Sequence, residues 1–221
     1  MIRLEERRAA KMIDGLIKDK IDPIWESLST PLVRIGMTPN QVTFAGLVLV
    51  SAVCAAYVWH GSALIFGITL AVAFTFDALD GAVARRRDMC SVVGGYFDAM
   101  VDRYQELVVF ATIAYVNDMW PLALLALTGG VFTSYAKART AIEMPISNTD
   151  WPDLFERLER VIFLSVVLIL QGTLDALGVN AGWFLGAGVA IYAVLSHATA
   201  LQRGLRAARM LRAHETKIGT P

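Results

Sequence analysis

The chain has 221 residues, of which 56% are hydrophobic and 18% are charged, and its formal net charge at pH 7 is zero. Soluble domains contain roughly 45–50% apolar residues, so this composition excludes an ordinary soluble domain and indicates an integral membrane protein. We expect membrane lipids among its partners, and no nucleic acid.

The basic residues are segregated along the chain. Every lysine and arginine falls in one of four windows, which are 3–34, 85–103, 137–160 and 203–217. Each gap between the windows can hold two helices of about 20 residues, joined by turns that contain Gly, Pro, Asn or Asp. The sequence therefore predicts an all-α protein with six membrane-spanning helices, at 39–59, 63–84, 94–116, 120–142, 157–175 and 183–205.

The positions of the basic windows also predict the orientation. Because Lys and Arg accumulate on the cytoplasmic side, all four windows, both termini and any site beside them should be cytoplasmic. We expect a multi-pass protein of the cell membrane, with a juxtamembrane segment over 1–34, a six-helix domain over 35–205 and a basic tail over 206–221.

The segment before the first span is amphipathic. Apolar residues recur at roughly helical spacing from Met12 to Ile24, with charges on the opposite face. This pattern predicts an interfacial helix on the inner leaflet, although a solvated helical tail would show the same pattern. Thr38 or Asn40 is the expected N-cap of the first span.

The second and third predicted spans carry acidic residues at their cytoplasmic ends. Asp77, Asp80 and Ala84 have spacing i, i+3, i+7, and Asp98 and Asp102 have spacing i, i+4, so each set should share one helix face. Four converging carboxylates would repel one another without bound cations. An oxygen-only ligand set favours Mg²⁺, Mn²⁺ or Ca²⁺ over zinc.

Three interpretations of these carboxylates are open from the residues alone. Two metal ions with an arginine and a spare carboxylate would suit attack on a phosphoryl group. Carboxylates inside a membrane also mark ion pathways, so a metal-ion transporter is a second interpretation. The third interpretation is structural ion pairing with Arg85–Arg87 and Arg103.

The complete pattern resembles the signature of the CDP-alcohol phosphatidyltransferases. The matching run is Asp77-x2-Asp80-Gly81-x2-Ala84-Arg85-x8-Gly94-x3-Asp98-x3-Asp102. The six-span layout is similar to that family too, over residues 35–205. The resemblance implies transfer of a phosphatidyl group from a CDP-linked lipid to an alcohol, with release of CMP, in a homodimer.

The resemblance also implies roles for the matching residues. Two Mg²⁺ or Mn²⁺ ions would be held by Asp77, Asp80, Asp98 and Asp102. Asp102 would also be the catalytic base that takes the proton of the acceptor hydroxyl. The nucleotide and diphosphate would lie against Asn40, Thr43, Asp80, Gly81, Ala84, Arg85 and Gly94.

A basic cluster at the same predicted membrane face bears on the acceptor. It consists of Lys137, Arg139, Arg157 and Arg160, and Arg206 or Arg203 of the last helix would add to it. These cations favour an acceptor that carries a phosphate. The blocks SYAKAR (134–139) and ERLER (156–160) resemble those of phosphatidylinositol-phosphate and archaetidylinositol-phosphate synthases, which implies inositol phosphate as the acceptor.

Other acceptors stay open at this point. The glycine that precedes the ER-x-ER block in those synthases has no counterpart here, where Asp153 or Leu154 stands. Glycerol 3-phosphate and phosphatidylglycerol are therefore alternative acceptors. The basic residues could also anchor helix ends at anionic head groups.

Overall fold

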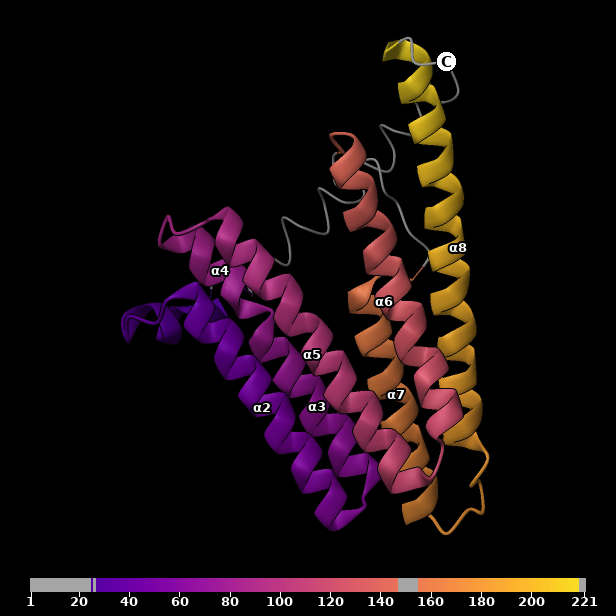
Figure 1. Ribbon diagram of the computed structural model, residues 1–221. Helices are drawn as coiled ribbons and strands as arrows, with labels where there is room; N and C mark the ends of the chain where they lie inside the picture. Colours follow the sequence, from indigo (N-terminus) through magenta and orange to yellow (C-terminus); the bar gives the residue numbers. More distant parts are fainter. Residues whose placement is uncertain (1–24, 26, 147–154, 219–221) are drawn as a thin grey trace, which may run out of the picture. The chain divides into compact units, whose positions relative to one another are not determined.

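A computed structural model describes residues 25, 27–146 and 155–218, and the described part of the chain contains helices but no strand. Figure 1 shows the helices in chain order. Their bounds are α2 Pro39–His60, α3 Ala63–Asp77, α4 Leu79–Arg86, α5 Val92–Asn117, α6 Trp120–Glu143, α7 Arg157–Ala176 and α8 Phe184–Ile218. The all-helical class is therefore confirmed.

Three of the described helical stretches are long and apolar enough to cross a membrane. They are Pro39–His60, Ala63–Arg86 and Phe184–Thr216. Helices α5, α6 and α7 lie where the other spans were expected, but each carries charged residues near one end. The count of six spans thus stays a prediction, and the interfacial helix expected over Met12–Ile24 lies outside the described residues.

Helix α2 starts at a capping box. Thr38 Oγ1 accepts a hydrogen bond from the Gln41 backbone N–H at 3.3 Å, and the Gln41 side chain accepts one from the Thr38 N–H at 2.9 Å. Pro39 occupies the first helical position, where its missing N–H costs nothing. Of the two expected N-caps, Thr38 is confirmed.

Two helices differ from the expected bounds. The span expected over 63–84 is interrupted at Ala78, so Asp77 ends α3 and Asp80 lies in the first turn of α4. Helix α8 continues past the expected end at residue 205 to Ile218, through the basic residues of the tail. Alternating arginine and alanine are good helix formers and explain this extension.

The chain divides into two compact units. The first contains the described residues up to Val48 together with Thr75–Val101. Its small core packs Leu32, Val42, Leu79 and Val83 together. Arg87 donates to the backbone carbonyl of Gly36 at 2.7 Å, and Arg86 donates to the Thr30 hydroxyl at 2.8 Å, so the end of α4 is tied to the segment before α2.

The second unit contains Leu49–Phe74 and the described residues from Asp102 onward. Its core includes the fully buried Tyr57, Phe66, Ile113 and Leu168. Figure 1 shows α6, α7 and α8 running alongside one another. Glycines allow helices α6 and α8 to approach each other closely. A Cβ at Gly129 would lie 2.7 Å from the Ser196 Cβ on α8.

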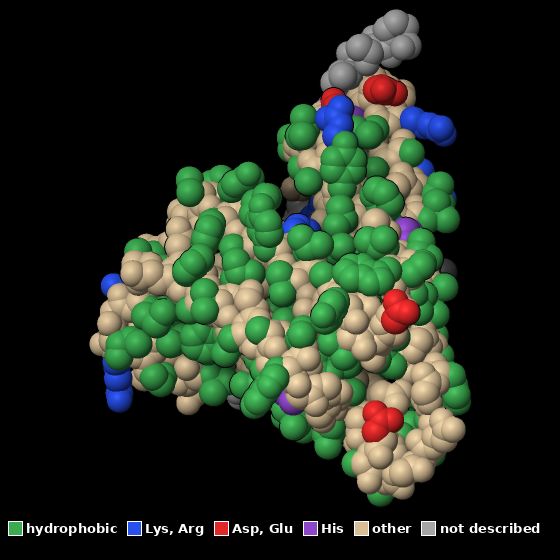
Figure 2. Space-filling model, turned by 60° about the horizontal axis from the view of Figure 1, so that its bottom comes forward, with side chains coloured by type: hydrophobic (Ala, Val, Ile, Leu, Met, Phe, Trp, Pro, Cys, Tyr) green, Lys and Arg blue, Asp and Glu red, His purple; other side chains and the backbone are tan. Residues whose placement is uncertain are grey.

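Large apolar side chains are exposed along the helices rather than only buried between them. Hydrophobic side chains spread over the face shown in Figure 2, with few charged ones among them. Val72, Leu124 and Val194 are examples from the middle of helices. In water such a surface would associate, and in a bilayer it faces lipid.

Candidate active site

The acidic residues of the signature lie on both sides of a short break in the helix. Asp77 ends α3 and Asp80 lies in the first turn of α4, with Ala78 between the two helices. Asp80 and Ala84 line one pocket, whereas Asp77 lies buried at the end of α3. One shared face for Asp77, Asp80 and Ala84 therefore stays a prediction.

Asp77 is held against a glycine. Its side chain is 1% exposed, and its carboxylate lies against Gly46 of α2 so closely that a Cβ at Gly46 would collide with Asp77 Oδ1. A buried carboxylate is stable only when other polar groups or cations compensate it. Gly46 thus provides the space that this carboxylate occupies.

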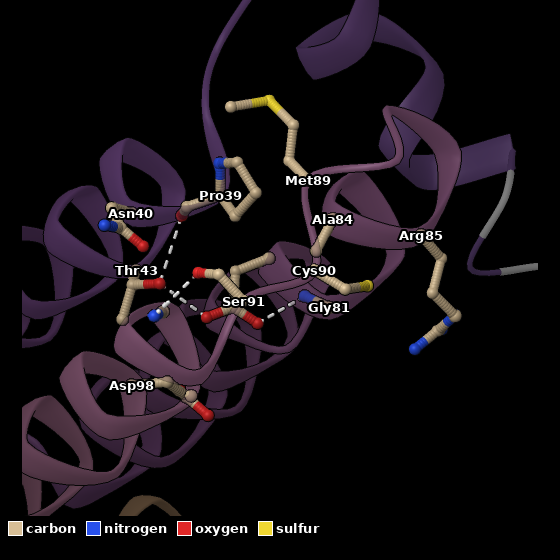
Figure 3. A pocket seen from close by; sticks show the side chains of 13 residues that line it. Pro39, Asn40, Thr43, Gly81, Ala84, Arg85, Met89, Cys90, Ser91 and Asp98 are labelled. Atoms are coloured by element: carbon tan, nitrogen blue, oxygen red, sulfur yellow. Dashed lines mark hydrogen bonds between the residues drawn. The ribbon is translucent and has the colours of Figure 1, made fainter.

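Asp80 is fixed by two donors. Thr43 Oγ1 donates to Asp80 Oδ2 at 2.5 Å, and the Gly81 backbone N–H donates to Asp80 Oδ1 at 2.5 Å. Figure 3 shows both bonds as dashed lines. Hydrogen bonds to an ionised carboxylate are short and strong. Thr43, which the resemblance assigned to the nucleotide, therefore also orients a carboxylate.

Asp80 belongs to a pocket of about 210 Å³ in the first unit. Figure 3 shows the side chains of α2, α4 and α5 around it. The pocket contains every residue that the resemblance assigned to the nucleotide and diphosphate. Its lining consists of Pro39, Asn40, Thr43, Asp80, Gly81, Ala84, Arg85, Met89, Cys90, Ser91, Gly94, Gly95 and Asp98.

The charges of this pocket suit a cation and an anion together. Asp80 and Asp98 supply carboxylate oxygens, and Arg85 supplies a guanidinium. The neighbouring Arg86 donates to the Thr30 hydroxyl and Arg87 to the Met37 carbonyl. Arg85 thereby remains the arginine of this run that lines the pocket.

Several lining residues were missed by the sequence reasoning. Ser91 accepts a hydrogen bond from the Gly94 N–H at 3.0 Å and caps the start of α5. The pattern Ser-x-x-Gly before an apolar run was a usable N-cap signal. Met89 and Cys90 belong to the α4–α5 loop, and no local pattern indicated that this loop borders the pocket.

Asp102 belongs to the second unit, one helical turn after Asp98 on α5. Its carboxylate forms an ion pair with Arg157 of α7, with 2.6 Å between Oδ1 and Nη2. Arg157 Nη2 also donates to the buried Gln105 side chain at 2.7 Å. The expected catalytic carboxylate is therefore paired with one of the expected acceptor-binding arginines.

The other expected acceptor residues are on α6 and α8. Arg139 is exposed, forms an ion pair with Glu143 at 2.5 Å, and lines a separate groove of about 800 Å³ along α6 and α8. Lys137 and Arg206 are half-buried on α6 and α8. Arg203 is buried and donates to the Thr133 carbonyl at 2.6 Å, which gives it a structural role.

A second set of charged residues accompanies Asp102. Glu106, one turn further along α5, is 7% exposed and forms ion pairs with Arg103 at 2.8 Å and Arg160 at 3.2 Å. Sequence reasoning missed Glu106, although a fifth carboxylate at helical spacing in an apolar stretch was visible. Arg103 was expected as a structural ion-pair partner of the acids, and its ion pairs with Asp102 and Glu106 agree with that interpretation.

The candidate ligands for the expected divalent metal ions are carboxylates. Among the described residues, no group of three or more His, Cys, Asp or Glu side chains lies close enough to hold one ion. The donors nevertheless fit a hard divalent cation, because Asp80 and Asp98 present carboxylate oxygens to one pocket.

Comparisons with known proteins agree with the geometry. Residues 36–195 match the CDP-alcohol phosphatidyltransferase family. An archaetidylinositol phosphate synthase from Pyrococcus horikoshii is 30% identical over 197 residues, which cover 88% of this chain and 96% of that protein.

Two solved structures of a relative are also similar. The crystal structure of Mycobacterium tuberculosis phosphatidylinositol phosphate synthase with CDP-DAG bound has a TM-score of 0.70 and 29% identity, and covers 84% of this chain and 94% of that one. The same enzyme in complex with manganese and citrate has a TM-score of 0.70 and 28% identity, and covers 83% and 88%.

Proposed function

Because this chain belongs to the CDP-alcohol phosphatidyltransferase family, we propose that it transfers the phosphatidyl-type group of a CDP-linked lipid to inositol phosphate and releases CMP. Family membership makes it a transferase of phospholipid synthesis. The observation that carries the proposal is the pocket that gathers Asp80, Gly81, Arg85 and Asp98, with Asn40 and Thr43 of α2, in one place.

The reaction is a substitution at phosphorus. The acceptor hydroxyl oxygen forms a bond to the phosphorus that carries the lipid. The bond between that phosphorus and the bridging oxygen breaks, and CMP leaves with the electron pair. The hydroxyl proton passes to the carboxylate of Asp102, which acts as general base. Arg85 stabilises negative charge on the diphosphate.

A divalent metal ion belongs to this chemistry, and manganese is present in a solved relative. Asp77, Asp80, Asp98 and Asp102 would hold two ions, Mg²⁺ or Mn²⁺. When bound, the ions neutralise the diphosphate and make CMP a better leaving group. Asp77 lies at the end of α3, Asp80 on α4, and Asp98 and Asp102 on α5.

The acceptor assignment rests on Arg157 and on the relatives. Arg157 is paired with Asp102 at 2.6 Å, so a phosphate bound by this guanidinium would bring its own hydroxyl groups near the base. A planar guanidinium suits phosphate recognition. Further positive charge would come from Lys137 and Arg139 of α6 and Arg206 of α8. The acceptors to be tested against inositol phosphate are glycerol 3-phosphate and phosphatidylglycerol.

The topology belongs to the proposal as well. Six spans with both termini and the site in the cytoplasm would let the nucleotide and the polar acceptor come from water while the lipid tail stays in the bilayer. The segregated Lys and Arg residues support this orientation. A homodimer is the expected assembly, by analogy with the family alone.

The test is CMP release by the purified protein in detergent with Mg²⁺ and CDP-diacylglycerol or its ether analogue. The acceptors are inositol 1-phosphate, glycerol 3-phosphate, free inositol and phosphatidylglycerol, and Asp102→Asn is the blank. We expect release with inositol 1-phosphate that stops when EDTA removes the metal.

Each alternative has its own outcome. Release with another acceptor alone would keep the reaction and overturn the acceptor assignment. No release with any acceptor, together with metal flux into liposomes, would replace the proposed function by a transporter. Wild-type rates in Asp102→Asn would remove Asp102 from the role of base.

A further inference from the structure

We propose that Glu106 is a positioning residue that holds Arg103 and Arg160 away from Asp102 and so leaves Asp102 to Arg157. The inference rests on the proposed function, because it concerns the base and the acceptor arginine of that reaction. It assigns a role to Glu106, which the family signature does not include. The charged set around it consists of Asp102, Arg103, Glu106, Arg157 and Arg160, here called the ion-pair cluster.

The cluster is built from facing positions on two helices. Asp102 and Glu106 are one turn apart on α5, and Arg157 and Arg160 are three residues apart on α7. Each carboxylate meets one guanidinium, with Asp102–Arg157 at 2.6 Å and Glu106–Arg160 at 3.2 Å. Two parallel ion pairs thus join α5 to α7.

Arg103 contacts both carboxylates, but at unequal distances. Its Nη1 lies 2.8 Å from Glu106 Oε2, and its Nη2 lies 3.9 Å from Asp102 Oδ2. At equal charge the shorter contact dominates, and a buried guanidinium that loses one carboxylate turns to another. Glu106 therefore keeps Arg103 from closing on Asp102.

Arg160 makes the competition stronger. It is 3% exposed, and its Nε and Nη1 have no hydrogen-bond partner among the described residues. Three arginines and two carboxylates form the cluster. If Glu106 were removed, Asp102 would be the one carboxylate left in the cluster for all three arginines. The extra guanidinium groups would then bind Asp102 and hinder both its action as base and its pairing with Arg157.

Gly130 of α6 completes the arrangement. A Cβ at this position would lie 2.6 Å from Arg160 Nη1 and 3.1 Å from Glu106 Oε2. The Gly130 carbonyl also accepts a hydrogen bond from Arg103 at 3.3 Å. The absence of a side chain here gives the Glu106–Arg160 pair its space.

The first experiment measures kcat and both KM values for Glu106→Gln, Arg103→Gln and the double variant. Glu106→Gln should lower kcat by about 10- to 100-fold, the range for groups that orient a catalytic ligand, with little change in the KM of the CDP-lipid. The double variant should be faster than Glu106→Gln, because the competing arginine is gone. A merely structural Glu106 predicts a double variant that is no faster.

The second experiment keeps the inference testable if Glu106→Gln does not fold. Gly130→Ala pushes on the Glu106–Arg160 pair, whereas Gly129→Ala is a matched control on the same helix that pushes on Ser196 instead. We expect Gly130→Ala to lose kcat beyond Gly129→Ala when both have a similar unfolding temperature in detergent. Equal losses would contradict the inference.

The outcomes separate the two proposals. An active wild type with an unchanged kcat in Glu106→Gln would overturn the positioning role and leave the proposed function standing. A wild type that releases no CMP with any acceptor would overturn the proposed function, and the positioning role would fall with it.

Discussion

Gly46 leaves room for the carboxylate of Asp77, a signature residue in the first unit. Asp77 is buried at the end of α3, and its carboxylate occupies the space where a Cβ of residue 46 would stand. A helix glycine is normally unfavourable by about 0.5–1 kcal/mol relative to alanine. Here the glycine is required because the larger residue would displace a carboxylate of the proposed metal site.

Gly46→Ala should therefore impair metal use rather than only stability. The added methyl group displaces the Asp77 carboxylate, and we expect the Mg²⁺ concentration for half-maximal CMP release to rise by about 10-fold or more. The measurement is a Mg²⁺ titration of activity. Gly186→Ala is the control, because a Cβ there has nothing within 4 Å. An unchanged Mg²⁺ dependence would separate Asp77 from the metal.

At the scale of the element, a break at Ala78 separates α3 from α4. Asp77 ends α3 and is buried, whereas Asp80 lies in the first turn of α4 and lines the pocket. Nothing in the local sequence marks this break, since Ala78 and Leu79 are strong helix formers. Contacts of the neighbouring residues Phe76 and Leu79 with the core of the first unit accompany it.

The packing of α7 against the start of α3 depends on Gly172. A Cβ at this position would collide with the Leu64 backbone N–H group, and backbone cannot move aside as a flexible side chain can. Gly172→Ala should destabilise the second unit by about 1–3 kcal/mol, as overpacking does. Thermal unfolding in detergent measures this effect, and an unfolding temperature equal to that of Gly186→Ala would disprove the contact.

For the whole molecule, the open question is how many helices cross the bilayer. The six-span prediction places the α4–α5 loop in the cytoplasm and the α7–α8 loop outside, since α5, α6 and α7 lie between them. Cys90 in the first loop and Asn180 in the second are both exposed. Cysteines at these positions therefore report on three crossings.

A membrane-impermeant maleimide tests this arrangement. In intact cells we expect labelling of Asn180→Cys in a Cys90→Ser background, and no labelling of Cys90 until the membrane is permeabilised. The buried Cys54 should stay unreactive in both proteins. Labelling of both positions from the same side would contradict three crossings.

What the sequence determined was local or periodic. The helix positions follow from apolar stretches without basic residues, and the start of α2 follows from Thr38. Six pocket residues follow from a spaced motif on α4 and α5, namely Asp80, Gly81, Ala84, Arg85, Gly94 and Asp98. These features depend on neighbours along one helix, so the order of residues contains them.

Only the tertiary structure decided which groups from distant segments meet. It paired Asp102 with Arg157, placed Glu106 between Arg103 and Arg160, and set Asp77 against Gly46. It also paired Arg139 with Glu143 on its own helix. The reason is physical: helical periodicity fixes which residues share a face, but the rotation and packing of each helix decide what that face touches.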